Sequence, residues 1–172
     1  RIEWHDRRQG VAAGDHGLAL LVGAARIVTA HLHGVADRVP DREQIYDLMV
    51  RYGRCVDTGD REELIRTCYT DDVVVQYDSW GSEGRPLVGT DEFSRFWGDG
   101  PLSWDSTHQF TNFTFEIGEN EGAYTCLGLA THWPRDVDNS SGVVPVYTVG
   151  LRYDNHVRRT GAGWRIARQH NV

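Results

Sequence analysis

Lysine is absent from this chain of 172 residues, and all 18 of its basic residues are arginine. We interpret this absence as a compositional bias rather than as a functional signal. The chain has 25 acidic residues and a net charge of −7. Because a nucleic-acid partner requires a clustered basic surface, this balance argues against nucleic-acid binding. The few basic runs, such as Arg158-Arg159, are too short to change that conclusion.

Cysteine is scarce, and Cys55, Cys68 and Cys126 are far apart and match no metal-binding spacing. We interpret them as buried free thiols of a reducing compartment. Long apolar runs are missing as well, because the nearest one, residues 18–28, falls well short of the roughly 20 residues that a membrane span needs. No convincing signal-peptide cleavage motif follows it, so we expect a cytoplasmic protein without a membrane partner.

The composition is otherwise that of an ordinary globular protein. Internal repeats and low-complexity tracts are absent, and hydrophobic and charged residues make up 40% and 25% of the chain. The length fits one domain with a sizeable core. Fold and function must therefore be inferred from the pattern of residues along the chain.

Apolar residues at helical spacing dominate the first part of the chain. Helices are predicted over residues 17–36, from Asp41 to Gly59, after Asp60 and over residues 90–97. Asp60 caps the third of these, with Glu63 three residues further on, as in a capping box. The apolar stripe of the second helix consists of Ile45, Leu48, Met49, Tyr52 and Val56.

From Asp71 onward the apolar period changes to two, which is typical of strands. Strands are predicted from Asp71 to Tyr77 and over residues 107–117, 122–134, 143–157 and 163–171. Two turns with the required glycine, at residues 119–122 and 160–163, join neighbouring strands as hairpins. Helices first and an antiparallel sheet afterwards indicate an α+β fold in which the sheet curls over the helices.

Three polar side chains interrupt these core-forming segments. Tyr52 and Asp57 lie near the end of the second helix, and His108 lies at the start of a long strand. An acid and an imidazole on core-lining elements cost free energy unless they are paired or hydrated, and proteins keep them mostly where a proton is transferred. The pattern predicts an acid–base site. Because no metal, nucleotide or flavin motif occurs, we expect no cofactor and no metal.

Each of these residues also has a structural explanation. Asp57 precedes Thr-Gly-Asp, a common helix-end pattern, although the following helix already has its own cap. His108 is either a structural histidine or part of a concave polar pocket, together with Phe110 and Asn112 on the same strand face. Tyr52 lies on the apolar stripe, where a tyrosine commonly belongs to the core.

Arg168 and several aromatic residues are further candidates. Arg168 follows Trp164 and Ile166 at period two, so we expect it to continue their core-facing row. There it meets either a carboxylate of the protein, or a ligand anion or solvent at the pocket mouth. The aromatic residues, which either belong to the core or line a pocket for a flat hydrophobic molecule, are Tyr77, Trp80, Trp97, Phe110, Trp133 and Tyr147.

The order of elements and four stretches of sequence resemble a known family. The stretches are RYGRCVDTGDREEL, DDVVVQYDSWG, HQFTN and YTVGLRYDNHVRRTGAGWRIARQ. They resemble the SnoaL-like family of the nuclear transport factor 2-like superfamily, whose kin include scytalone dehydratase, ketosteroid isomerase and bile-acid dehydratases. The resemblance covers residues 41–172 and leaves residues 1–40 as an N-terminal extension. It implies a cone-shaped α+β barrel, with a curved, mainly antiparallel sheet wrapped around N-terminal helices.

The resemblance also implies roles for individual residues. Asp57 and His108 fall on the acid–base pair of the family's dehydratases. Tyr52 has the spacing of a tyrosine in the bile-acid enzymes and would polarise the substrate oxygen. Arg168 matches a basic residue near the substrate, and Tyr77 matches a pocket tyrosine of scytalone dehydratase.

The chain departs from the family pattern at one position. The second catalytic histidine of scytalone dehydratase falls near Thr125, and His132, further along the same strand, need not replace it. We retain His132 as a candidate substrate-binding residue. The other candidates for substrate binding are Arg168, Tyr77, Asn112, Phe110, Trp80 and Tyr147.

The resemblance thus implies a small cofactor-free enzyme, a dehydratase (lyase) or isomerase, that acts on a hydrophobic polyketide- or steroid-like molecule. A polyketide cyclase and a non-catalytic binding or assembly module of the same fold are the alternatives. The strands carry apolar residues on both faces, which predicts a homo-oligomer, with a dimer favoured over a trimer. These residues include Val144, Val146, Thr148, Leu127 and Leu129.

Overall fold

The computed structural model describes residues 39–78, 84–98, 104–135 and 145–172. The chain divides into two units between residues 39 and 40, and the elements below build the second unit. The predicted helix over residues 17–36 and the candidate residue Trp80 lie outside the described residues.

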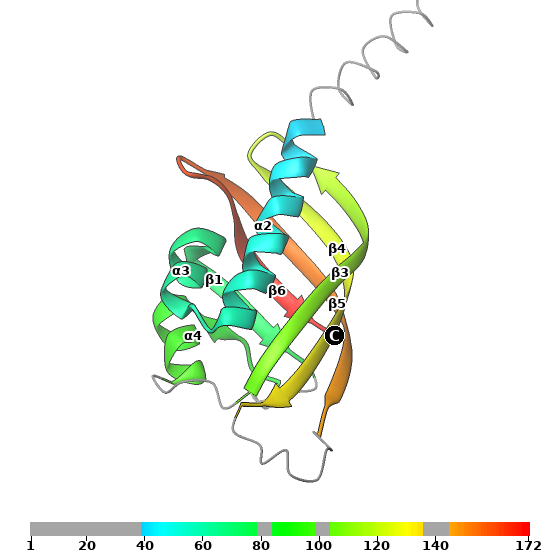
Figure 1. The fold of residues 1–172 in the computed structure, drawn as a ribbon. Helices are drawn as coiled ribbons and strands as arrows, with labels where there is room; N and C mark the ends of the chain where they lie inside the picture. Colours follow the sequence, from blue (N-terminus) through cyan, green and yellow to red (C-terminus); the bar gives the residue numbers. More distant parts are fainter. Residues whose placement is uncertain (1–38, 79–83, 99–103, 136–144) are drawn as a thin grey trace, which may run out of the picture. The chain divides into compact units, whose positions relative to one another are not determined.

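The described elements form one curved sheet with helices on one of its faces (Figure 1). In chain order they are α2 (Val39–Thr58), α3 (Arg61–Cys68), β1 (Tyr69–Tyr77), β2 (Leu87–Val88), α4 (Thr90–Trp97), β3 (Trp104–Ile117), β4 (Glu121–Pro134), β5 (Tyr147–Thr160) and β6 (Gly163–Asn171). The strand order is β2-β1-β6-β5-β4-β3. All neighbours are antiparallel except β1 and β6, which are parallel.

The predicted α+β class, with a curved and mainly antiparallel sheet against N-terminal helices, is confirmed. The expected barrel is not closed, because within the described residues the sheet ends at β2 on one side and at β3 on the other. None of the described helices is long and apolar enough to cross a membrane.

The core lies between the helices and the inner, concave face of the sheet. The stripe predicted for α2 is buried as far as Tyr52, and Cys55 rather than the half-buried Val56 continues it. Burial of each large apolar side chain contributes about 1.5–3 kcal/mol to stability. The strand residues buried in this core include Val73, Val75, Tyr124, Tyr153, Val157, Trp164 and Ile166.

Capping fixes the start of α3 as predicted, and burial extends the strand that follows it. Asp60 accepts a hydrogen bond from the backbone N–H of Glu63 at 3.0 Å. β1 begins at Tyr69, directly after α3 and before the predicted Asp71. Tyr69 is buried and pairs with Ile166 of β6, so the tertiary contact overrides the local pattern.

A bulge in β3 reverses the face of one predicted site residue. Thr111 pairs with Leu127 and Thr114 with Thr125, so β3 contains one residue more than β4 over this interval. Asn112, with a φ of 56°, lies in the bulge and is exposed. The expectation that Asn112 shares an inner face with His108 is therefore wrong, because the extra residue breaks the period of two.

A second bulge has the same effect in β6. His156 pairs with Arg168, whereas Val157 pairs with Ile166, so Ala167 is the extra residue. Arg168 is exposed on the outer face. The expectation that Arg168 continues the core-facing row of Ile166 is wrong, and Gln169 occupies the inner face in its place, fully buried.

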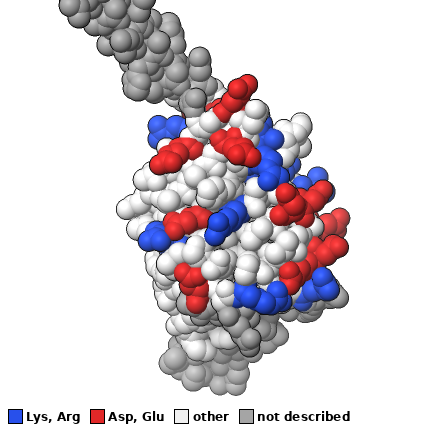
Figure 2. Space-filling view, turned by 180° about the vertical axis from the view of Figure 1, so that it is seen from behind, with Lys and Arg blue, Asp and Glu red and all other residues white. Residues whose placement is uncertain are grey.

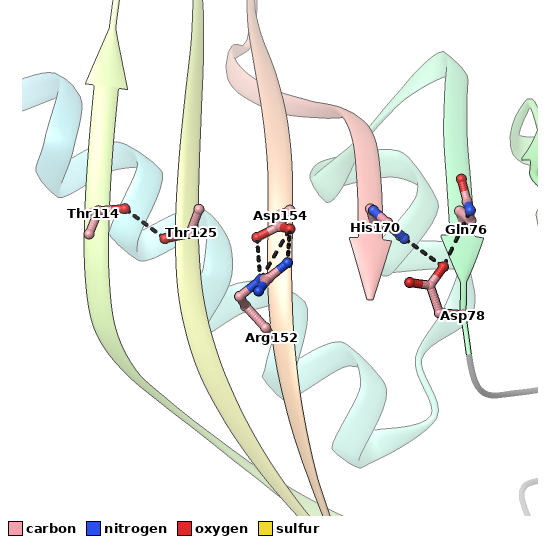
Figure 3. Close-up of polar contacts among 7 residues, drawn as sticks. All are labelled: Gln76, Asp78, Thr114, Thr125, Arg152, Asp154 and His170. Carbon is pink, nitrogen blue, oxygen red and sulfur yellow. Dashed lines mark hydrogen bonds and ion pairs between the residues drawn. The ribbon is translucent and has the colours of Figure 1, made fainter. Parts of the chain in front are cut away.

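The face of the sheet opposite the helices, here called the outer face, carries acidic and basic residues interspersed among uncharged ones (Figure 2). Several of its polar side chains pair within the chain, including Arg152 with Asp154 and His170 with Asp78 (Figure 3). Leu127 and Leu129 on β4 are 47% and 45% exposed. No described helix covers this face (Figure 1).

Candidate active site

Asp57 and His108 meet where the end of α2 approaches β3. Nδ1 of His108 lies 2.6 Å from Oδ1 of Asp57, and the backbone N–H of His108 donates to Oδ2 at 3.0 Å. Oγ of Ser106 donates to Oδ1 at 2.9 Å. One strand therefore holds the carboxylate by three hydrogen bonds.

The end of α2 places Asp57 at this point. Gly59 has a φ of 72°, a conformation that glycine adopts without strain. Its N–H donates to the carbonyl of Val56, and the N–H of Asp60 donates to the carbonyl of Cys55. This pair of bonds is a Schellman motif, which ends the helix immediately after Asp57 and Thr58.

The hydrogen-bond pattern determines what the imidazole of His108 offers to a ligand. A carboxylate accepts but does not donate, so Nδ1 of His108 carries the proton in the bond to Asp57. Nε2 is then the nitrogen with the free lone pair, as a general base requires. The His108 side chain is only 7% exposed and that of Asp57 24% exposed, so bulk water screens the pair weakly.

His132 lies next to this pair. It pairs with Ser106 across β3 and β4, and its ring lies 5.8 Å from that of His108 at 83°. Nδ1 of His132 is buried and has no hydrogen-bond partner among the described residues. Burial lowers the pKa of His132, and its proximity to His108 lowers it further. The arrangement thus places a neutral imidazole beside the Asp57–His108 pair.

Aromatic rings surround the two histidines. Phe110 stacks on His108 at 6.1 Å, and Tyr147 stacks on His132 at 4.6 Å with an interplanar angle of 7°. Trp104 meets Tyr147 edge to face at 5.5 Å. The structure therefore brings three predicted substrate-binding residues, Phe110, His132 and Tyr147, to the acid–base pair.

Tyr52 is separated from this cluster by its hydrogen bonds. Its hydroxyl accepts from Nε2 of Gln169 at 3.2 Å, and the hydroxyl of Tyr69 donates to Oε1 of Gln169 at 2.8 Å. Burial raises the pKa of Tyr52 to about 12, so it stays protonated at physiological pH. Its ring contacts Phe110 at 6.2 Å, but no described hydrogen bond joins its hydroxyl to Asp57 or His108.

A small apolar cavity lies between the helices and β1. Its volume is about 40 Å³, which is room for a few water-sized groups rather than for a whole substrate. The lining includes Tyr52 and the predicted pocket residue Tyr77, whose ring stacks on Phe96. Asp57 and His108 are not among its lining residues, which are Tyr52, Cys55, Val56, Gly59, Arg61, Leu64, Ile65, Tyr77, Phe93, Ser94 and Trp97.

Two residues at the site, Ser106 and Trp104, and Gln169 in the neighbouring core were not predicted from the sequence. Ser106 stands two residues before His108, so the period of two in STH contained a signal for it. Trp104 continues that period at the start of the strand. Gln169 was hidden, because only the bulge at Ala167 turns it inward. Among the described residues, no group of three or more His, Cys, Asp or Glu side chains is arranged to hold a metal ion.

Comparison with known proteins identifies relatives at the level of family and fold. Residues 37–170 match the model of the SnoaL-like domain. No match was found among curated proteins. A protein of Novosphingobium aromaticivorans, provisionally described as a scytalone dehydratase, is 19% identical with a TM-score of 0.67, over 80% of this chain and 86% of its own.

Two further structures are similar in fold. A Streptomyces avermitilis protein of the NTF2-like family, provisionally described as a dehydratase, is 18% identical with a TM-score of 0.63, over 77% of this chain and 95% of its own. The association domain of Caenorhabditis elegans CaMKII is 16% identical with a TM-score of 0.60, over 79% of this chain and 98% of its own. At these identities the likeness shows the fold alone.

Proposed function

Because the chain belongs to the SnoaL-like family, we propose that its Asp57–His108 pair makes it a cofactor-free acid–base enzyme, a dehydratase or isomerase of a hydrophobic small molecule. The observation that carries this proposal is the 2.6 Å contact between Nδ1 of His108 and Oδ1 of Asp57. It supports a base role because it orients the imidazole and leaves Nε2 for the substrate. The polyketide- or steroid-like character of the substrate belongs to the proposal as well.

The proposed reaction begins with proton abstraction. Nε2 of His108 takes a proton from a carbon next to a carbonyl group, and the C–H electron pair enters an enolate. Asp57 stabilises the imidazolium that forms. His132, as a neutral imidazole, donates a hydrogen bond to the oxygen on which negative charge develops.

Two outcomes are available to the enolate. In a dehydration, the electron pair forms a carbon–carbon double bond as the bond to a β-hydroxyl breaks, and the imidazolium returns its proton to that hydroxyl, which leaves as water. In an isomerisation, the imidazolium returns the proton to a different carbon. In both cases His108 ends neutral, so neither route requires a cofactor.

The experiment measures proton abstraction directly. In D₂O, the wild-type protein should accelerate deuterium incorporation next to the carbonyl of 2-tetralone, a flat hydrophobic ketone, as followed by NMR. We expect His108→Ala and Asp57→Asn each to reduce this exchange by at least about 100-fold. His156→Ala, which removes an exposed histidine from the outer face, is the matched control and should exchange like the wild type.

One observation favours a second, non-catalytic function. Asp57 also accepts the backbone N–H of His108 on the edge strand β3, so it holds the strand to α2. If that were its whole role, Asp57→Asn would turn an amide N–H toward one of these donors and lose about 1–3 kcal/mol of stability, whereas His108→Ala would keep the backbone bond. Thermal melts and deuterium exchange together separate the two functions, since a melting temperature that falls in Asp57→Asn while exchange survives in both variants favours the structural role alone.

We also propose that two copies of the chain associate through the outer face. The exposed Leu127 and Leu129 support this assembly, because an uncovered apolar sheet face commonly becomes an interface. The likeness to a CaMKII association domain supports it further, since that domain shares the fold. A cytoplasmic location stays a prediction.

A further inference from the structure

Four rings form a continuous row at one end of the sheet. Trp104 lies edge to face with Tyr147 at 5.5 Å and 81°, and Tyr147 stacks in parallel on His132 at 4.6 Å and 7°. His132 lies edge to face with His108 at 5.8 Å and 83°. The row therefore connects Trp104 to the imidazole that the proposed function makes the base.

The row runs from solvent to the buried pair. Trp104 is 39% exposed and Tyr147 is 45% exposed, whereas the His108 side chain is 7% exposed. Most other large aromatic side chains of the described part are buried or half-buried in the core. Exposed rings cost free energy in water, so two in contact beside a candidate catalytic pair call for an explanation.

The strand register places the two exposed rings together. Tyr147 of β5 pairs with His132 of β4, and Trp104 of β3 pairs with Pro134, two residues further along β4. Trp104 and Tyr147 thus lie on either side of β4, and their rings meet across it. Because the two planes are nearly perpendicular, the two rings form a corner.

We propose that Trp104 and Tyr147 form a docking platform for a planar, conjugated ring of the substrate, and that Trp104 determines specificity for it. A planar ring stacks on one of the two exposed rings and presents its edge to the other, the two geometries that aromatic quadrupoles favour. A saturated ring of the same size gains neither contact. This inference rests on the proposed function only because it takes the Asp57–His108 pair as the place of proton transfer. The docking of the ring itself requires no proton transfer.

The test compares two probes of similar size and different shape, 2-naphthol and its saturated counterpart decahydro-2-naphthol. Isothermal titration calorimetry on the full chain should give a lower Kd for 2-naphthol. Trp104→Leu should reduce this preference by about 3- to 10-fold, which is the range expected for one aromatic pair. Trp104→Phe should retain most of it, since it keeps an aromatic face.

Tyr46→Leu is the matched control. Tyr46 is 45% exposed, like Tyr147, and forms a ring pair with Phe113 at 5.0 Å on a different part of the molecule. Its substitution should leave the preference unchanged. The proposal is overturned if the wild type binds both probes equally, if Trp104→Leu keeps the full preference, or if Tyr46→Leu loses as much of it.

A further variant separates this proposal from the proposed function. His108→Ala should keep the preference for 2-naphthol while losing deuterium exchange. If deuterium exchange persists in His108→Ala, the proposed base role of His108 is wrong, but the proposed docking platform is not affected. If Trp104→Leu leaves the preference for 2-naphthol unchanged, only the proposed docking platform is wrong. A loss of preference in His108→Ala as large as that in Trp104→Leu contradicts the assignment of specificity to Trp104.

Discussion

At the scale of single residues, Asp57 combines two roles that share the same contacts. It accepts from the side chains of Ser106 and His108 and from the backbone of His108, so it both ties β3 to α2 and orients the imidazole. The pair was predictable because Asp57 ends a striped helix and His108 opens a strand. The resemblance to known dehydratases pointed to the same two residues. For Ser106, which donates to Asp57, the strand period of two was the only signal in the sequence.

Ser106→Ala tests how strongly the orientation of the Asp57–His108 pair depends on the hydrogen bond from Ser106. The substitution removes one hydrogen bond to Oδ1 of Asp57 and leaves both bonds from His108. We expect a loss of about 1 kcal/mol in the free energy of unfolding. Deuterium exchange should fall by less than the decrease seen for Asp57→Asn, because the imidazole remains oriented. Thr107→Ala, on the opposite strand face, is the control.

His132 gives the stability of the protein a defined pH dependence. Its folded-state pKa is lowered by burial and by His108, whereas in the unfolded chain it titrates near its usual value, about 6.5. As the pH falls through that value, the unfolded chain binds the proton first, so stability decreases until the pH reaches the folded pKa. At a pH above both the folded and the unfolded pKa, His132 does not change the stability with pH.

His132→Phe keeps a ring between Tyr147 and His108 but removes this titration. Urea denaturation at pH 8, 6.5 and 5 should therefore show that the wild type loses more stability on acidification than the variant. The comparison cancels the titration of all other groups to a first approximation. If stability changes with pH in the same way in the two proteins, His132 has the same pKa in the folded and the unfolded chain, which would contradict this prediction.

At the scale of elements, the limits of sequence reasoning coincide with two bulges. The capping of α3 and the α+β order of helices and strands follow from local patterns, and the structure confirms them. Asn112 and Arg168 were placed on the inner face by a period of two, which holds only while the strands stay in register. Cross-strand pairing sets where a bulge occurs, and that pairing is not encoded in one strand alone.

Asn112 offers a direct test of the bulge in β3. Its φ of 56° lies in the left-handed region, which glycine adopts freely, asparagine tolerates and β-branched residues avoid. Asn112→Gly should leave stability nearly unchanged, whereas Asn112→Val should lose about 1–2 kcal/mol, as measured by urea denaturation. Deuterium exchange by Asn112→Gly should match the wild type. A loss of exchange would return Asn112 to the site in which the strand period of two had placed it.

At the scale of the whole molecule, the outer face is suited to a second copy of the chain. Leu127 and Leu129 are exposed on β4, while the neighbouring charges Arg152 and Asp154 already pair with each other on β5 (Figure 3). Association over these residues would bury apolar area while Arg152 and Asp154 stay paired, so it would avoid the cost of isolating either of these two charges. In a two-fold dimer each of these residues occurs twice in the interface, so one substitution acts twice.

The corresponding prediction concerns mass in solution. Sedimentation velocity at micromolar concentration should give about twice the 19.5 kDa of one chain for the wild type. Leu127→Asp and Leu129→Asp should each shift it to the monomer, because each places two unpaired carboxylates in the interface. Val88→Asp, at a 59% exposed position on the edge strand β2, should stay dimeric. A monomeric wild type would contradict the dimer, and a dimeric Leu127→Asp would place its interface elsewhere than the outer face.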